Sequence, residues 1–211
     1  PNGPYSITHF DDAEGNIRYR RINHTWVNGK CKYCGVSKKT ALGNENRKTE
    51  LETHAYEWIH TDNPERLLNM KFDVIISNPP YQLDDGGNGA SAKPIYHRFI
   101  EQAKKLNPRY LTMIIPARWY AGGKGLDNFR KSMLDDGQIS HLVDYVNAKD
   151  CFPGISIGGG VCYFLRTKGY SGRCHYTNIH DGHTSTAIRR LNEYEAVSYT
   201  HLRAHETRSN L

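Results

Sequence analysis

The sequence predicts an α/β fold with a mostly parallel, doubly wound sheet, and three observations lead to this prediction. From residue 72 onward, apolar runs of strand length alternate with amphipathic segments of helix length. The first run, residues 72–76, is rich in β-branched residues, which is typical of a strand buried on both faces. The last two runs have no helix between them, so we expect them to pair antiparallel at the edge of the sheet.

Each predicted element has its own sequence pattern. The first helix carries its apolar side chains on one face, and the second helix ends in Gly137, which suits a C-cap. In chain order the elements are a strand over 72–76, a helix over 94–106, a strand over 110–116, a helix over 125–137, a strand over 141–146 and a strand over 160–167. Ligands bind beyond the carboxyl ends of the strands in such sheets, so the residues that follow 76 and 116 are candidate site residues.

The composition favours an acidic partner and a location inside the cell. Hydrophobic residues make up 37% of the 211 residues, and no apolar run is long enough to span a bilayer or resembles a signal peptide. We therefore expect a cytoplasmic protein with no membrane partner. The formal net charge of +6 favours nucleic acid, the commonest acidic partner. The five cysteines are expected to be reduced thiols or metal ligands, because no secretory signal accompanies them.

The chain divides into four parts by composition. Residues 1–70 are polar and include a cysteine pair, residues 71–170 contain the predicted sheet, and residues 171–196 are interpreted as the start of a truncated C-terminal region. Residues 197–211 have no helical or strand periodicity and resemble the translated read-through of a sequencing adapter. We therefore expect an internal fragment of a longer protein.

The first predicted strand ends in Asn78-Pro79-Pro80-Tyr81, the NPPY corner. One interpretation is an ordinary turn, because Asn and Pro are common turn residues and Pro-Pro stops the ladder. Chance would produce these four residues together about once in a thousand chains of this size. The other interpretation is chemical. The Asn78 amide oxygen and the Pro79 carbonyl can accept both hydrogens of an exocyclic amine, and Tyr81 offers a ring on which a flipped base stacks.

The NPPY corner and the residues after it resemble the S-adenosylmethionine-dependent amino-methyltransferases. The likeness is closest to the DNA adenine-N6 methylases of restriction–modification systems, and it extends from Phe72 to about Arg166. It is carried by Phe99 and Ala103 of an F-x-x-x-A helix, by Ile114-Ile115-Pro116, by the segment "LDNFRKSML", by the strand "LVDY" and by Phe152-Pro153. The resemblance implies the second half of a Rossmann-like class I methyltransferase sheet, with residues 71–170 as a catalytic half-domain.

The same resemblance implies a reaction and roles for individual residues. A methyl group would pass directly from S-adenosylmethionine to the N6 amino group of adenine in double-stranded DNA, with no covalent enzyme intermediate. Phe152 would stack against the flipped base together with Tyr81. Phe99 would pack near the adenine of the cofactor, and Asn78 would also contact the cofactor. Any single buried Phe is, by itself, more often a core residue than a site residue.

The sequence departs from the family pattern before residue 72. The glycine-rich cofactor loop, F-x-G-x-G, and the acidic ribose-binding residue are not present there. We therefore expect this fragment alone to bind S-adenosylmethionine poorly and to be inactive.

Residues 1–70 contain a candidate structural zinc site. Cys31-x-x-Cys34 supplies two thiolates, and a closed tetrahedral site needs two more ligands. The predicted set is His24, Cys31, Cys34 and His54, forming a zinc-knuckle-like insertion. His54 and His60 lie six residues apart, too far to pair as i and i+4 on one α-helical face. The alternative is a pair of free cysteines in a surface loop.

Two other functions remain open from the sequence. The first is a methyltransferase with the same tetrapeptide that acts on protein glutamine or on rRNA guanine. The second is a non-catalytic, zinc-dependent nucleic-acid-binding module. The extended likeness after Tyr81 favours the adenine enzymes over both alternatives.

Overall fold

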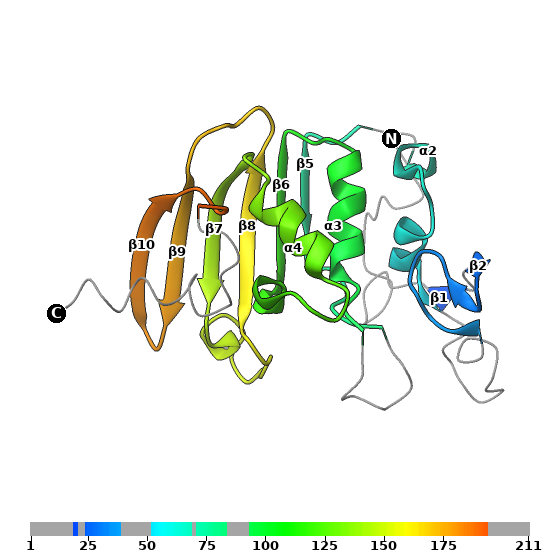
Figure 1. Cartoon of the computed structure of the whole chain (residues 1–211), viewed down its shortest axis with the longest axis horizontal. Helices are drawn as coiled ribbons and strands as arrows, with labels where there is room; N and C mark the ends of the chain where they lie inside the picture. The colour runs from blue at the N-terminus through cyan, green and yellow to red at the C-terminus, as the bar shows by residue number, and fades with distance from the viewer. Residues whose placement is uncertain (1–18, 21–23, 39–51, 69–70, 84–92, 194–211) are drawn as a thin grey trace, which may run out of the picture. The chain divides into compact units, whose positions relative to one another are not determined.

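The computed structural model describes residues 19–20, 24–38, 52–68, 71–83 and 93–193, and it omits side-chain detail for 19–20, 52–56 and 67–68 (Figure 1). The chain forms two compact units. Unit 1 comprises Pro1–Lys71 and Gln82–Leu106, and unit 2 comprises Phe72–Tyr81 and Asn107–Leu211. No helix in the described ranges is long and apolar enough to cross a membrane.

Unit 2 is built on a six-stranded sheet with the strand order β10-β9-β7-β8-β6-β5. Its strands are β5 (Val74–Ser77), β6 (Tyr110–Pro116), β7 (Ile139–Tyr145), β8 (Val161–Thr167), β9 (Cys174–His180) and β10 (His183–Arg189). The pairings of β5 with β6 and of β7 with β9 are parallel, and the other three are antiparallel. Four strands, β5, β6, β7 and β9, therefore run in one direction, while β8 and β10 run in the other.

The predicted antiparallel pair exists, but its position in the sheet was predicted wrongly. β7 and β8 pair antiparallel, yet β8 lies inside the sheet between β6 and β7. The connection from β6 to β7 leaves a gap one strand wide, and β8 returns to fill it. The edge is formed instead by the hairpin of β9 and β10, which continues the sheet beyond β7.

The prediction that the first strand is buried on both faces is also wrong. Within the described residues β5 pairs with β6 and ends the sheet on that side. Val74 and Ile76 are 49% and 77% exposed. On β6 the alternate residues Leu111, Met113 and Ile115 are buried, so one face of this part of the sheet carries the core.

Two helical segments follow β6 and cover that core. The 3₁₀ helix η3 (Ala117–Ala121) leads to α4 (Asp127–Leu134), where Phe129 and Met133 are buried. The rings of Trp119 and Phe129 meet edge to face at 5.9 Å, and Trp119 Nε1 donates to Cys162 Sγ on β8 at 3.4 Å. Aromatic packing of this kind fixes η3 against the sheet at the point where β6 ends.

Unit 1 has short elements. They are β1 (Tyr19–Arg20), β2 (Trp26–Val27), β3 (Lys30–Cys31), β4 (Glu52–Thr53), the 3₁₀ helix η2 (His54–Ile59), α2 (Pro64–Leu68) and α3 (Tyr96–Lys105). β2 and β3 form a hairpin through Asn28-Gly29, both with positive φ, as a two-residue type I′ turn requires. A buried cluster packs around the cysteine pair and consists of Cys31, Cys34, Ile59, Leu83, Ile95 and Phe99.

The units divide between Lys71 and Phe72, one residue from the predicted boundary at residue 70, and they have no division at 170. Helix α3, expected within the catalytic half-domain of residues 71–170, groups with the N-terminal residues. Strands β9 and β10, expected to begin a separate C-terminal region, belong to the sheet of unit 2. The segment predicted to be a non-native tail, 197–211, lies outside the described residues.

Candidate active site and metal site

The NPPY corner lies at the carboxyl end of β5 in unit 2. β5 ends at Ser77, opposite Met113 of the parallel strand β6, and residues 78–81 leave the ladder. Asn78 is exposed and Pro79 is buried. Because parallel strands have their carboxyl ends at the same edge, the corner lies at the end of the sheet where β6 gives way to η3. This is the edge at which open α/β sheets bind ligands.

Tyr81 lies close to a second segment that the sequence marked as a candidate. Burial raises the pKa of the Tyr81 phenol to about 12, and the nearby Cys151 and Cys162 side chains add to the effect. Cys151 directly precedes Phe152, whose ring is half-buried and whose backbone N–H donates to Ala148 at 2.8 Å. The structure therefore brings the NPPY corner and the segment at 151–152 to the same end of the sheet, although 70 residues separate them.

A buried polar group on β7 and β9 was not recognised in the sequence. The fully buried Asp144 carboxylate on β7 accepts hydrogen bonds from Tyr176 Oη at 3.1 Å and from Asn178 Nδ2 at 3.3 Å. These bonds offset part of the cost of removing a carboxylate from water. The signal was an aspartate in the run "HLVDYV", next to the apolar residues Leu142 and Val143.

Tyr120 on η3 faces the same group. Burial raises the pKa of its phenol well above the ordinary value, and the nearby Cys162, Asp144 and Tyr176 side chains raise it further. The phenol therefore stays neutral at physiological pH. Its backbone carbonyl accepts from Arg130 Nε at 2.8 Å, which joins η3 to α4.

Exposed basic residues follow the carboxyl ends of β6 and β7, the two strands on either side of β8. Arg118 lies in η3 after β6, and Lys149 lies in η4 (Ala148–Asp150) after β7. Because β5, β6 and β7 run in the same direction, these positive charges lie at the same end of the sheet as the NPPY corner. They give this end a surface suited to a phosphate backbone.

Phe99 has a local explanation for its burial. It lies on α3 in unit 1 and packs in the cluster around Cys31 and Cys34, and its carbonyl accepts a hydrogen bond from Trp58 Nε1 at 3.5 Å. A contact with the adenine of a cofactor therefore stays a prediction.

Unit 1 brings together a group of metal-binding side chains. Among the described residues, His24, Cys31, Cys34 and His60 (the metal cluster) place one ligand atom each within 4.8 Å of one another. Three of the four ligands predicted from the sequence are in this group. The fourth position belongs to His60, while the side chain of the predicted His54 lies outside the described residues.

The other side chains of the metal cluster favour the deprotonated form of the Cys31 thiol. Hydrogen bonds from the Cys34 side chain, and then from His24, His60 and the Cys34 backbone, hold the pKa of the Cys31 thiol far below its ordinary value, although burial opposes this. A deprotonated thiol surrounded by imidazole nitrogens is the chemical state of a metal ligand.

Comparison with known sequences identifies a family. The model of the Eco57I restriction-modification methylase family matches residues 5–152. A protein of Mycoplasma pneumoniae named "Uncharacterized adenine-specific methylase" is 39% identical over 153 residues, which cover 68% of this chain and 36% of that protein.

Among solved structures, the type IIG restriction endonuclease BpuSI is similar with a TM-score of 0.46 and 13% identity, covering 64% of this chain and 22% of that one. The methyltransferase subunit of a type I restriction-modification system from Streptococcus thermophilus has a TM-score of 0.39 and 14% identity, covering 67% and 33%. The chain thus spans about a third of the curated relative's length, and a third or less of these two structures.

Proposed function

Because this chain belongs to the Eco57I restriction-modification methylase family, we propose that it is part of an enzyme that methylates the N6 amino group of adenine in double-stranded DNA. The methyl donor is S-adenosylmethionine. The observation that supports the proposal most strongly is the position of the NPPY corner at the carboxyl end of β5, with Tyr81 close to the segment that contains Phe152. A DNA substrate also implies that the enzyme acts in the cytoplasm.

The chemistry of the corner follows from the weakness of its target as a nucleophile. The lone pair of the adenine amine is delocalised into the ring. The Asn78 amide oxygen and the Pro79 carbonyl accept the two amine hydrogens, which returns the lone pair to nitrogen and stabilises the positive charge that develops there. Two successive prolines fix φ on both sides of the carbonyl, so the acceptor needs little reorganisation during the reaction.

The aromatic residues hold the base outside the duplex. Tyr81 offers one ring face and Phe152 a second, and stacking compensates for the base–base stacking that is lost when adenine flips out. The Tyr81 phenol stays neutral at physiological pH because its pKa is raised to about 12. It therefore acts as a stacking surface and not as a base.

The residues of this chain fit one end of a cofactor site. Asn78 is exposed at the carboxyl end of β5, so its side chain is accessible to a ligand. When bound, S-adenosylmethionine supplies an electrophilic methyl group. The glycine-rich loop and acidic ribose residue of the family are not found before residue 72. We therefore expect methyl transfer from a longer protein that contains this chain, and little or none from the 211 residues alone.

Product identification tests this proposal. The longer protein is incubated with S-adenosylmethionine carrying a labelled methyl group and with duplex DNA, ribosomal RNA or cell protein in parallel. We expect label in DNA, recovered as N6-methyladenine after digestion to nucleosides. Label in guanine of rRNA or in protein glutamine would instead support the other amino-methyltransferases. Absence of label in all three substrates, with DNA binding retained, would favour the non-catalytic zinc-dependent module.

A further inference from the structure

The metal cluster lies in unit 1 and plays no part in the chemistry proposed for the NPPY corner, so it needs an explanation of its own. Its four side chains come from two separate segments, residues 24–34 and residue 60. Two of them are cysteines, with exposed fractions of 3% and 8%. We propose that His24, Cys31, Cys34 and His60 bind one zinc ion in a closed, structural site.

The distances suit a tetrahedral zinc ion. Zinc lies about 2.3 Å from thiolate sulfur and about 2.0 Å from imidazole nitrogen, so the ligand atoms of a tetrahedral site are separated by roughly 3.3–3.8 Å. Cys34 Sγ and His24 Nδ1 are 3.6 Å apart. All four ligand atoms lie within 4.8 Å of one another. Closing around an ion therefore needs shifts of at most about 1 Å, which side-chain rotation can supply.

The backbone already has the form of a two-cysteine ligand loop. Cys31 N–H donates to the Val36 carbonyl at 2.8 Å, and Gly35 N–H donates to the Cys31 carbonyl at 3.0 Å. Gly35 has a φ of +76°, a conformation that other residues adopt with strain. This turn brings Cys34 back beside Cys31, so the two thiols are positioned before any ion binds.

The two histidines are positioned by separate elements. Lys32 N–H donates to the Thr25 carbonyl at 2.8 Å, which holds the residue after His24 against the cysteine turn. His60 follows η2, and its N–H donates to the Glu57 carbonyl at 3.1 Å. The two imidazole rings meet nearly perpendicular with centroids 5.0 Å apart. Rings in this arrangement can each direct a nitrogen toward a common point.

The two thiolates and two imidazoles indicate which metal ion binds and whether it has a structural or a catalytic role. Two thiolates and two imidazoles are typical of zinc, whereas magnesium and calcium prefer oxygen ligands. Four protein ligands leave no open position for water or substrate, so the ion stabilises the fold and takes no part in chemistry. A redox-active disulfide between the cysteines is the competing explanation, but it assigns no role to two converging histidines.

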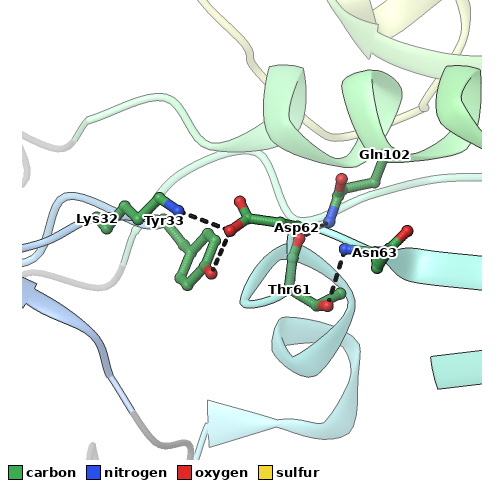
Figure 2. A network of polar contacts seen from close by, with 6 residues as sticks. All are labelled: Lys32, Tyr33, Thr61, Asp62, Asn63 and Gln102. Atoms are coloured by element: carbon green, nitrogen blue, oxygen red, sulfur yellow. Dashed lines mark hydrogen bonds and ion pairs between the residues drawn. The ribbon is translucent and has the colours of Figure 1, made fainter. Parts of the chain in front are cut away.

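The zinc ion would join the cysteine turn to the segment that holds α3. Gln102 on α3 donates to the carbonyls of Trp58 and Thr61 at 2.8 and 2.6 Å, on either side of His60. Lys32 and Tyr33, next to the cysteines, bind the Asp62 carboxylate at 2.7 and 3.2 Å (Figure 2). The two contacts with Asp62 are exposed and stabilise little by themselves. A metal bond between His60 and the cysteine turn would make the same connection strongly.

Zinc content with paired histidine variants tests the proposal. The 211-residue chain, purified without chelator, is expected to contain one zinc per chain by mass spectrometry of the metal. His60→Ala should lose most of this zinc, while the matched control His54→Ala should keep it. Loss of zinc from His54→Ala and retention by His60→Ala would overturn the ligand set. A wild-type chain without zinc, or with Cys31 and Cys34 joined as a disulfide, would overturn the site itself.

A second variant keeps the test decisive if His60→Ala does not fold. His60→Cys replaces one ligand by another, so it should still bind one metal ion. When cobalt(II) replaces zinc, the wild type should show the visible bands of a tetrahedral site with thiolate charge transfer. His60→Cys should increase the thiolate charge-transfer absorbance by about half, because thiolates rise from two to three. An unchanged spectrum would show that residue 60 is not a ligand.

Discussion

The two units of this chain hold together by different means. Unit 2 has a six-stranded sheet and fully buried large side chains such as Trp119, Tyr120 and Tyr176. Unit 1 has two-residue strands, and the buried cluster around Cys31 and Cys34 has six members in the described part of the chain. A cluster of that size gives the cysteine segment, residues 24–34, little stabilisation through burial alone. Unit 2 therefore carries its candidate site on a six-stranded sheet, whereas the cysteine segment of unit 1 depends on local cross-links.

The largest expected difference is in the loss of unfolding free energy between two substitutions in unit 2, one in its core and one on its outer strand β5. Ile115 on β6 is fully buried and Ile76 on β5 is 77% exposed. Ile115→Ala should lower the free energy of unfolding by about 2–5 kcal/mol through lost burial and a cavity. Ile76→Ala should change it by less than about 0.5 kcal/mol. Hydrogen exchange of β6 and β8 peptides reports the stability of unit 2, and equal losses in the two variants would contradict the described core.

The next effect concerns acid sensitivity in unit 1. Burial, with a further contribution from Arg98, lowers the pKa of His97 on α3 to about 4. The folded state therefore binds the proton less well than the unfolded state, whose pKa is near 6.5. Stability is highest above pH 6.5 and falls as the pH drops toward 4. Between pH 7 and pH 5 the loss should be about 2 kcal/mol.

Hydrogen exchange of α3 peptides at the two pH values checks this expectation. His97→Leu serves as the control because residue 97 can no longer be protonated. The metal cluster is the same in the wild type and in the variant, so any acid sensitivity that it causes is equal in both. The variant should lose about 2 kcal/mol less than the wild type over the same interval. If the two proteins lose protection equally, His97 is not the source of the acid sensitivity.

The smallest effect distinguishes the two ends of the sheet in unit 2. Lys149 lies at the end that carries the NPPY corner. Lys168 is also exposed but follows β8, which runs in the opposite direction, so it lies at the other end. If Lys149 contacts a DNA phosphate, Lys149→Gln should reduce the slope of log affinity against log salt by about 0.9. Lys168→Gln should leave that slope unchanged.

Fluorescence anisotropy of a labelled DNA duplex, measured over a range of salt concentrations, gives both slopes. An equal reduction in the two variants would mean that DNA binding does not select the end of the sheet with the NPPY corner.

The elements with strong local patterns could be predicted from the sequence. The strand expected at 110–116 is Tyr110–Pro116, and the helix expected at 94–106 is Tyr96–Lys105. Strand neighbours could not be predicted, because the insertion of β8 between β6 and β7 depends on contacts distant in sequence. β9 and β10 were missed because Thr, His and Ser weaken their apolar pattern. Their Asp181-Gly182 turn, with both φ values positive, was an available hairpin signal.

The metal cluster shows a similar limit. Cys31 and Cys34 could be recognised by their spacing, and His24 lies close to them in sequence. His60 joins them through a contact distant in sequence, which a count of residues does not reveal, and His54 stays a prediction because its side chain lies outside the described residues. Asp144 was overlooked as a buried polar centre for a related reason, since its partners Tyr176 and Asn178 come from a strand that was not predicted.

The most direct test of the account is the methyl-transfer rate of Asn78→Ala in the longer protein that contains this chain. Removing one acceptor for the amine should lower kcat/KM on duplex DNA by about 10²–10³-fold. S-adenosylmethionine affinity, measured by calorimetry, should change far less than this rate. Asn78→Asp keeps an acceptor oxygen and should retain more activity than Asn78→Ala. A near-normal rate in Asn78→Ala would contradict the role assigned to the NPPY corner.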